Sequence, residues 1–384
     1  MGFEGNYNNF KKYYFEDIFL FSTGKNIKQS EASPEFEYPC IRYGELYHMY
    51  NEVVSKIINK TNLDKTELLF SKGDEILLPS AGEDPLDIGS ASALTVSNVA
   101  IGRTINILRP KSELKYSSIF ASYYINQQLK KKIASLAKGV SISNVYNSDL
   151  KKLEITLPNF EEQQRIALFL SLIDERIQTQ IKIIEDYKLF KKGMMKKIFN
   201  QEIRFKDKQG VFYPEWKKKK LGEVLDYEQP TKFIVNSTEY ENNYNTPVLT
   251  AGKSFILGFT NEEENIYKTL PVIIFDDFTM ANKFVDFDFK VKSSAMKILK
   301  ARNKTVNLKF VYECIQMIYY PKGDEHKRFW ISEYSKIKID YPSTEEQQKI
   351  SSTLSSIDNK ISLESEYLEK LKSQKKYLLQ NLFI

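Results

Sequence analysis

A stretch of about twenty residues occurs twice in this chain and constrains its fold more than any other feature. The first copy, "PNFEEQQRIALFLSLIDERI", begins at Pro158, and the second, "PSTEEQQKISSTLSSIDNKI", begins at Pro342, 184 positions later. Eleven positions are identical between residues 157–177 and 341–361. Because an internal repeat is one structural unit used twice, both copies are expected to fold alike.

Each copy has the sequence features of a helix start followed by a coiled-coil stripe. Asn159 or Ser343 is a suitable N-cap, and Glu162 or Glu346 follows three residues later as the partner in a capping box. Apolar residues then recur at a spacing of three or four, which predicts a heptad seam. The predicted seam consists of Ile166, Leu170, Ile173, Ile177, Ile184 and Ile198 in the first copy and Ile350, Leu354, Ile357, Ile361, Leu368, Leu371, Leu378 and Leu382 in the second.

The seam is interrupted by polar residues at matching places in both copies. Gln180 corresponds to Glu364, and Lys191 corresponds to Lys375. Either the seam meets another partner at these points, or the long side chains reach past it to solvent. Each helix would be about 60 Å long at 1.5 Å per residue. The linker at 201–215 spans at most about 50 Å, which favours an antiparallel helix pair.

The segments in front of the two helices predict two domains of one type. Both end in an alternating, strand-like stretch, "LKKLEITLP" and "YSKIKIDYP". Before these ends, strand-like runs ("DEILLPS" and "INILRP" in the first, "PVIIFDD" and "MKILKA" in the second) precede one helical stretch each, near 117–137 and 308–319. We therefore expect an α+β chain with two mixed α/β domains in pseudo-twofold arrangement, joined by two long antiparallel coiled-coil helices. The expected boundaries are 1–157 (first domain), 158–200 (first long helix), 201–215 (linker), 216–341 (second domain) and 342–384 (second long helix).

Composition narrows the possible functions. The chain has 384 residues, a net charge of +6 and two cysteines, and it shows no secretory signal or membrane-spanning apolar run, so a cytoplasmic protein is expected. Its two histidines have no neighbouring catalytic pattern, and no phosphate-binding loop or zinc motif is present. The carboxylates of "FDDF" and "DEHK" are weak candidates for a metal site. The sequence therefore predicts a non-catalytic chain with no metal site.

Two similar domains held at a fixed distance can recognise two half-sites on a linear polymer, and the mild positive charge is compatible with DNA. Cationic side chains contact phosphates, whereas arginine, amide and hydroxyl groups also read base edges. The candidate DNA contacts are Arg103, Arg109, Lys138, Ser141, Ser143 and Asn144 in the first domain and Lys283, Lys290, Lys292, Lys322, Lys327, Arg328 and Trp330 in the second.

The order of these segments resembles a known family. The "EEQQ" helix, the stretch "KKGMMKKIFNQEIRFKD", the restart "PEWKKKKLGEV" and the second helix ending in "KKYLLQNLF" are similar to the specificity subunit of type I restriction-modification systems (HsdS). The resemblance covers nearly the whole chain. It implies two target recognition domains that each read half of a split double-stranded DNA site, and a coiled coil that sets the spacer.

The resemblance also implies partners. The helices would carry two modification subunits that methylate adenine N6, with restriction/translocase subunits completing an ATP-dependent endonuclease. S-adenosylmethionine, ATP and Mg²⁺ would bind to those subunits, and this chain would hold no cofactor. The alternative is a non-catalytic structural adaptor with two protein-binding end domains.

Overall fold

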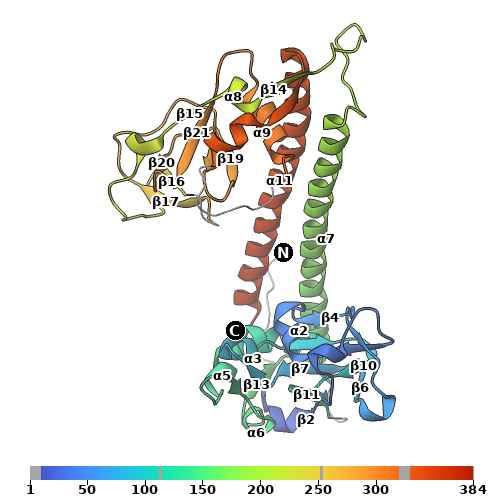
Figure 1. Ribbon diagram of the computed structural model, residues 1–384. Coiled ribbons are helices and arrows are strands. Elements are labelled where there is room, and N and C mark those ends of the chain that lie inside the picture. The colour runs from blue at the N-terminus through green and yellow to red at the C-terminus, as the bar shows by residue number, and fades with distance from the viewer. Residues whose placement is uncertain (1–9, 112–114, 251–253, 320–328, 384) are drawn as a thin grey trace. The chain divides into compact units, whose positions relative to one another are not determined.

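The computed structural model describes residues 10–111, 115–250, 254–319 and 329–383 (Figure 1). The chain divides into two compact units: unit 1 comprises Met1–Ile181 and Glu366–Ile384, and unit 2 comprises Lys182–Ser365. The division falls within both long helices, α7 (Phe160–Phe199) and α11 (Thr344–Leu382). Both repeats therefore form long helices, as the capping and heptad patterns predict.

Unit 1 contains a mixed domain built on two larger sheets. The strands predicted in "DEILLPS" and "INILRP" are β7 and β11, which are antiparallel neighbours with Leu77 opposite Ile107. The five-stranded sheet has the order β2 (Phe19–Thr23), β11 (Ile105–Pro110), β7 (Glu75–Pro79), β9 (Ser92–Leu94) and β4 (Val53–Val54). The four-stranded sheet has the order β5 (Lys60–Thr61), β3 (Tyr38–Ile41), β10 (Ser97–Ile101) and β6 (Phe70–Lys72). A small pair joins β12 (Ser143–Asn144) to β8 (Ala81–Gly82).

The helices of this domain are short and cover its apolar core. They are α1 (Phe15–Ile18), α2 (Tyr43–His48), α3 (Pro85–Ile88), α4 (Ser118–Tyr124), α5 (Lys130–Ser135) and α6 (Asn147–Leu150), with a π-helical turn at Ile125–Leu129. Ser117 caps α4 by accepting a hydrogen bond from the Phe120 amide. The predicted helical stretch at 117–137 is thus α4, the π-helical turn and α5.

Unit 2 repeats this organisation with fewer elements. The strands predicted in "PVIIFDD" and "MKILKA" are β18 and β21, again antiparallel neighbours, with Ile274 opposite Ile298. The sheets have the orders β15 (Leu225–Glu228), β21 (Met296–Ala301), β18 (Val272–Asp276), β19 (Asn282–Val285), and β17 (Ile256–Thr260), β16 (Thr246–Leu249), β20 (Lys290–Val291). The helices in front of α11 are α8 (Leu221–Val224), α9 (Leu308–Gln316) and α10 (Phe329–Ser332).

Each domain is closed by the same two-stranded pair at its chain ends. In unit 1, β1 (Lys11–Tyr14) pairs antiparallel with β13 (Glu154–Leu157), and Lys11 lies opposite Leu157. In unit 2, β14 (Lys217–Lys220) pairs with β22 (Lys338–Tyr341), and Lys217 lies opposite Tyr341. The chain therefore enters and leaves both domains through the same kind of antiparallel strand pair.

The two long helices run antiparallel within each unit. In unit 1, Leu382 and Phe383 at the end of the chain pack against the same core as Ile166 and Leu170 near the start of α7. In unit 2, Ile198 near the end of α7 shares a core with residues at the start of α11. An end that packs beside a start fixes the antiparallel direction that the linker length favours.

The predicted seam positions all face away from solvent to some degree. Those that are buried are Ile166, Leu170, Ile177, Ile184, Ile198, Ile350, Leu354 and Leu371, and those that are half-buried are Ile173, Ile357, Ile361, Leu368, Leu378 and Leu382.

Among the described residues, no helix is both long and apolar enough to cross a membrane.

Candidate nucleic-acid interface

Three predicted DNA contacts of the first domain lie on its surface. Arg103 is exposed in the turn between β10 and β11. Lys138 and Ser141 are exposed in the loop 138–144, which folds back on itself because Lys138 and Asn144 exchange backbone hydrogen bonds. Gly139 has a φ of +134°, and a Cβ there would collide with the Ile142 carbonyl, so the loop requires glycine.

Two further candidates in this domain contact the domain itself. Arg109 donates from Nε to a carboxylate oxygen of the fully buried Glu75 at 3.1 Å and from Nη1 to Ser22 Oγ at 3.0 Å. Ser143 is buried in the pair formed by β12 and β8. Burial of Ser143 corrects its assignment as a DNA contact, whereas Arg109 is half-buried and its DNA contact stays a prediction. Asn144 is half-buried in the same loop.

The second domain gives a similar division. Lys283 is exposed on β19, and half-buried Lys292 donates to the Tyr240 hydroxyl at 3.3 Å. Lys290 and Trp330 are only 1% and 2% exposed, so their prediction as DNA contacts is corrected to core positions. Burial of the Lys290 ammonium is compensated by Glu262, whose carboxylate lies 2.6 Å away. Lys322, Lys327 and Arg328 lie outside the described residues.

A cavity of about 410 Å³ lies beside the turn after β18 in the second domain, and sequence reasoning missed it. Gln229, Ser293 and Ser294 line it together with half-exposed Phe278 and the buried Lys297. Amide and hydroxyl groups beside an aromatic ring can form hydrogen bonds and apolar contacts with base edges. The "SS" pair after β20 was the only available signal, and it is too common to distinguish from an ordinary turn.

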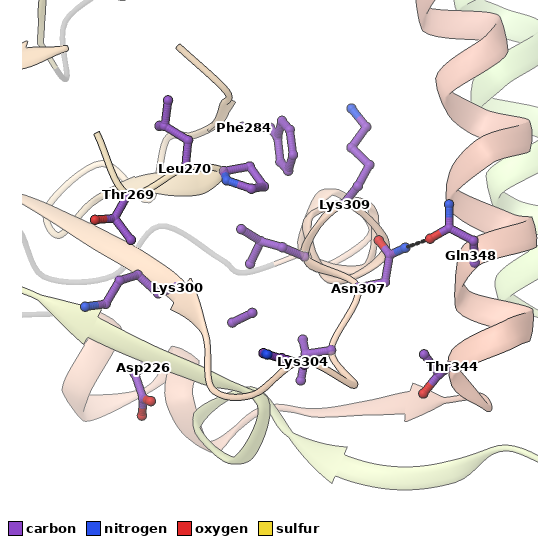
Figure 2. Close-up of a pocket in the computed structure, with 14 residues that line it drawn as sticks. Asp226, Thr269, Leu270, Phe284, Lys300, Lys304, Asn307, Lys309, Thr344 and Gln348 are labelled. Carbon is purple, nitrogen blue, oxygen red and sulfur yellow. Dashed lines mark hydrogen bonds between the residues drawn. The ribbon is translucent and has the colours of Figure 1, made fainter. Parts of the chain in front are cut away.

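A larger cavity of about 690 Å³ lies between β21, α9 and the start of α11 in unit 2 (Figure 2). Lys300, Lys304 and Lys309 line it, and Asn307 Nδ2 donates to Gln348 Oε1 at 2.8 Å on its α11 side. Lys300 pairs with Glu228 at 2.8 Å, and Lys309 pairs with acidic neighbours as well. Since most of the positive charge is already neutralised, the cavity is a weak site for phosphate.

The adjacent carboxylates of "FDDF" are structural. Asp276 accepts hydrogen bonds from the amides of Phe278 and Thr279, which closes the turn after β18. Asp277 pairs with Lys297 at 3.4 Å and accepts the Trp330 amide at 2.9 Å. Over the described ranges, no three metal-ligating side chains gather into a candidate ion site. The "DEHK" stretch lies outside those ranges.

The identical glutamines of the repeat join each long helix to its domain. Gln163 accepts the Ser117 amide at 3.0 Å through Oε1 and donates to the Pro158 carbonyl at 2.8 Å through Nε2. Gln347 makes the same two bonds, at 3.0 Å each, to the Asn307 amide and the Pro342 carbonyl. Ser117 and Asn307 are the N-caps of α4 and α9.

Each glutamine thus ties the start of a long helix to the start of the principal domain helix. Sequence reasoning missed this role, although the identity of both glutamines was the available signal. The predicted caps are present, since Asn159 and Ser343 accept the amides of Glu162 and Glu346 at 2.9 and 3.3 Å.

The second glutamate of the repeat has a different use in unit 2. The buried Glu346 carboxylate accepts hydrogen bonds from Arg204 Nε at 3.2 Å and Trp216 Nε1 at 2.9 Å. Arg204 also donates to the carbonyls of Tyr213 and Pro214. The glutamate therefore anchors the linker at 201–215 to the start of α11, rather than closing a capping box.

Comparison with known proteins identifies what this frame belongs to. The family model described as "Type I restriction modification DNA specificity domain" matches residues 7–186 and 213–373, one match for each domain with its helix. The chain belongs to this family. As a type I specificity subunit, it serves DNA sequence recognition.

Individual relatives agree with this. The specificity subunit of the Escherichia coli enzyme EcoR124I/EcoR124II is 54% identical over 135 residues, which cover 34% of this chain and 33% of the relative. The MjaVIII specificity subunit of Methanocaldococcus jannaschii is 27% identical over 86% of this chain and 82% of its own. The crystal structure of the S subunit from M. genitalium shares the fold, with a TM-score of 0.68 at 20% identity over 100% of this chain and 98% of that one.

Proposed function

We propose that this specificity subunit recognises a split double-stranded DNA site, with one recognition domain for each half. The observation that carries the proposal is that two different domains are joined to their long helices by the same contacts. The strand pairs β1/β13 and β14/β22 share one register, and Gln163 and Gln347 make the same two hydrogen bonds. Two domains that share their attachment to the helices but differ in structure are suited to recognising two half-sites of different sequence.

The two recognition domains differ in their second sheet and in the polar side chains near it. Unit 1 carries the four-stranded sheet β5-β3-β10-β6, beside which Glu45 binds Arg42 at 2.6 Å and Asn59 at 3.0 Å. Unit 2 has the smaller sheet β17-β16-β20 and the cavity lined by Gln229 and the serines. Different arrangements of donors and acceptors read different base edges, so the two half-sites should differ in sequence.

We further propose that the long helices carry two methyltransferase subunits. Exposed apolar side chains on α7 support this: Leu168 and Leu172 in unit 1 and Leu189 and Phe190 in unit 2 are more than half exposed. Apolar side chains displayed in this way are typical of protein contacts. S-adenosylmethionine would then bind to the methyltransferase subunits, and ATP and Mg²⁺ to restriction/translocase subunits in the full complex.

The proposal is tested by mapping DNA methylation. The chain is produced with its methyltransferase partner in cells that lack other adenine methylation, and modified adenines are located by single-molecule sequencing. We expect N6-methyladenine in one sequence made of two unlike halves at a fixed spacing. Methylation at a single continuous motif would contradict the two-domain assignment, and a complex that binds no DNA even at low salt would favour a structural adaptor.

The role of the helices as a spacer is tested separately. Deleting seven residues, one heptad, from α7 and the matching seven from α11 should change the recognised spacing or abolish recognition, since a helix loses about 10 Å over that length. Both half-site sequences should be retained. New half-sites with an unchanged spacing would show that the helices do not set the distance.

A further inference from the structure

Two clusters around a half-buried lysine, one in each unit, connect a recognition domain to the helix pair. In unit 1, the Lys375 ammonium on α11 lies 2.7 Å from the Asp174 carboxylate on α7 and 3.0 Å from the Glu52 carboxylate of the domain. The Tyr123 hydroxyl on α4 donates to the other Asp174 oxygen at 2.5 Å. Helix α11, helix α7 and the domain therefore meet at one cation.

Unit 2 contains the corresponding arrangement. The Lys191 ammonium on α7 lies 2.8 Å from the Asp358 carboxylate on α11 and 3.1 Å from the Glu313 carboxylate on α9. Lys309 bridges the same two carboxylates at 3.2 and 3.3 Å. In both clusters the central lysine side chain is 16% exposed, so its charge is largely removed from water.

The residues that the long helices contribute to each cluster lie at equivalent positions of the repeat, whereas the carboxylates that the domains contribute do not. Lys191 and Lys375 are 184 positions apart, as are Asp174 and Asp358. Glu313 comes six residues after the N-cap of α9, and the residue six after the N-cap of α4 is Tyr123, which has no carboxylate. In unit 1 the carboxylate comes instead from Glu52, on the chain just before β4.

Simple core filling does not account for this pattern. An apolar side chain in a heptad seam would avoid the desolvation cost that a buried lysine carries. The carboxylates of Glu52 and Asp174 outweigh the effect of burial and raise the pKa of Lys375, so the ammonium stays charged. The two diverged domains supply a carboxylate from different elements to the corresponding lysine of each repeat, which indicates that the contact itself is used.

We infer that Lys191 and Lys375 are positioning residues for sequence recognition, each fixing the orientation of one recognition domain on the helix pair by binding that domain's carboxylate. The inference rests on the proposed function. An ion pair suits this task because its direction is set by charged groups at defined positions, whereas an apolar contact allows neighbouring orientations of similar energy. A domain fixed in orientation presents its half-site at one distance and rotation from the other half-site.

The test is a spacer competition with the assembled methyltransferase complex. DNA duplexes carry the two wild-type half-sites separated by the natural spacer, or by one base pair more or fewer, and the methylation rate of each is compared. In Lys375→Met and Lys191→Met, we expect the ratio of the methylation rate on the natural spacer to the rate on an altered spacer to fall at least about tenfold, equivalent to about 1.4 kcal/mol. Half-site sequences should remain unchanged, and Lys375→Arg should restore part of the preference.

Matched variants separate this role from general stability. Lys372→Met removes an exposed lysine of α11 whose one ion pair among the described residues is with the exposed Glu369, and its spacer preference should equal wild type. Glu52→Gln keeps the shape of the domain partner and should reproduce the Lys375→Met effect, with little further loss in the double variant. A similar fall in rate at all spacers, or an unchanged preference in both Lys375→Met and Glu52→Gln, would overturn the inference. A wild-type complex without any fixed spacer would refute the proposed function instead.

Discussion

Replacement of Gln163 by leucine tests the joint between helix and domain most directly. The side chain is 2% exposed, and leucine has a similar volume, so the change removes two hydrogen bonds with little change in packing. The Ser117 amide and the Pro158 carbonyl lose their partners. A buried backbone group without a partner costs about 1–3 kcal/mol, so the two together should destabilise unit 1 by about 2–6 kcal/mol.

The neighbouring glutamine supplies the control. Gln164 is exposed on the same turn of α7, and Gln164→Leu should change stability by no more than about 0.5 kcal/mol. Hydrogen exchange of peptides that contain residues 117–120 reports on the joint itself, and urea unfolding followed by circular dichroism reports on the whole chain. Protection should fall only in Gln163→Leu. Equal protection and equal urea midpoints in the two variants would refute the reasoning that makes the repeated glutamine a structural joint.

Three further predictions concern the recognition domains. Glu262→Gln should destabilise unit 2 by about 3 kcal/mol in thermal unfolding, because it leaves the buried Lys290 ammonium without its carboxylate. Although burial works to raise it, the pKa of Glu262 is lowered by hydrogen bonds from Lys290 and two backbone amides. Its contribution is therefore present above about pH 4.3 and is lost as the pH falls further, so wild type and Glu262→Gln should converge in acid. Arg103→Ala and Lys138→Ala should each reduce the salt dependence of DNA binding by about one counterion in a titration against NaCl, and unchanged slopes would exclude phosphate contact. Burial raises the pKa of the Cys314 thiol well above its usual range, so iodoacetamide should label it only after unfolding, as mass spectrometry would show.

The architecture was predictable because its signals are periodic or repeated. The heptad spacing predicts α7 and α11, and the alternation at "EITL" and "KIDY" predicts β13 and β22. Each of these patterns follows from which side of an element is buried, and that information is local. The direction of the helix pair was also accessible, since a short linker limits where the second domain can begin.

The individual DNA contacts were much less predictable, because a basic residue looks the same in sequence whether it is solvated or paired. Lys290 and Lys283 both flank one alternating stretch, yet the first is buried against Glu262 and the second is exposed. Arg109 lies one position from the buried Leu108, and its partner Glu75 is 34 residues earlier in the chain. Only tertiary pairing distinguishes these cases, and a single sequence does not contain it in readable form.

Several of the positions that are identical in the two repeats can now be explained by their contacts. Pro158 and Pro342 offer the carbonyls that bind the repeated glutamines, and Asp174 and Asp358 hold the two central lysines. The repeated apolar residues at the helix starts are buried in the cores that join helix to domain. Positions that face solvent in α7, such as Leu168 and Leu172, are serines at the matching places in α11. At these positions the repeat is therefore retained where a helix holds a domain, and it diverges where leucines of α7 face solvent. Exchange of one recognition domain for another should accordingly depend less on overall similarity than on three features: an N-cap amide for the glutamine, a closing strand pair of the same register, and one carboxylate within reach of the lysine.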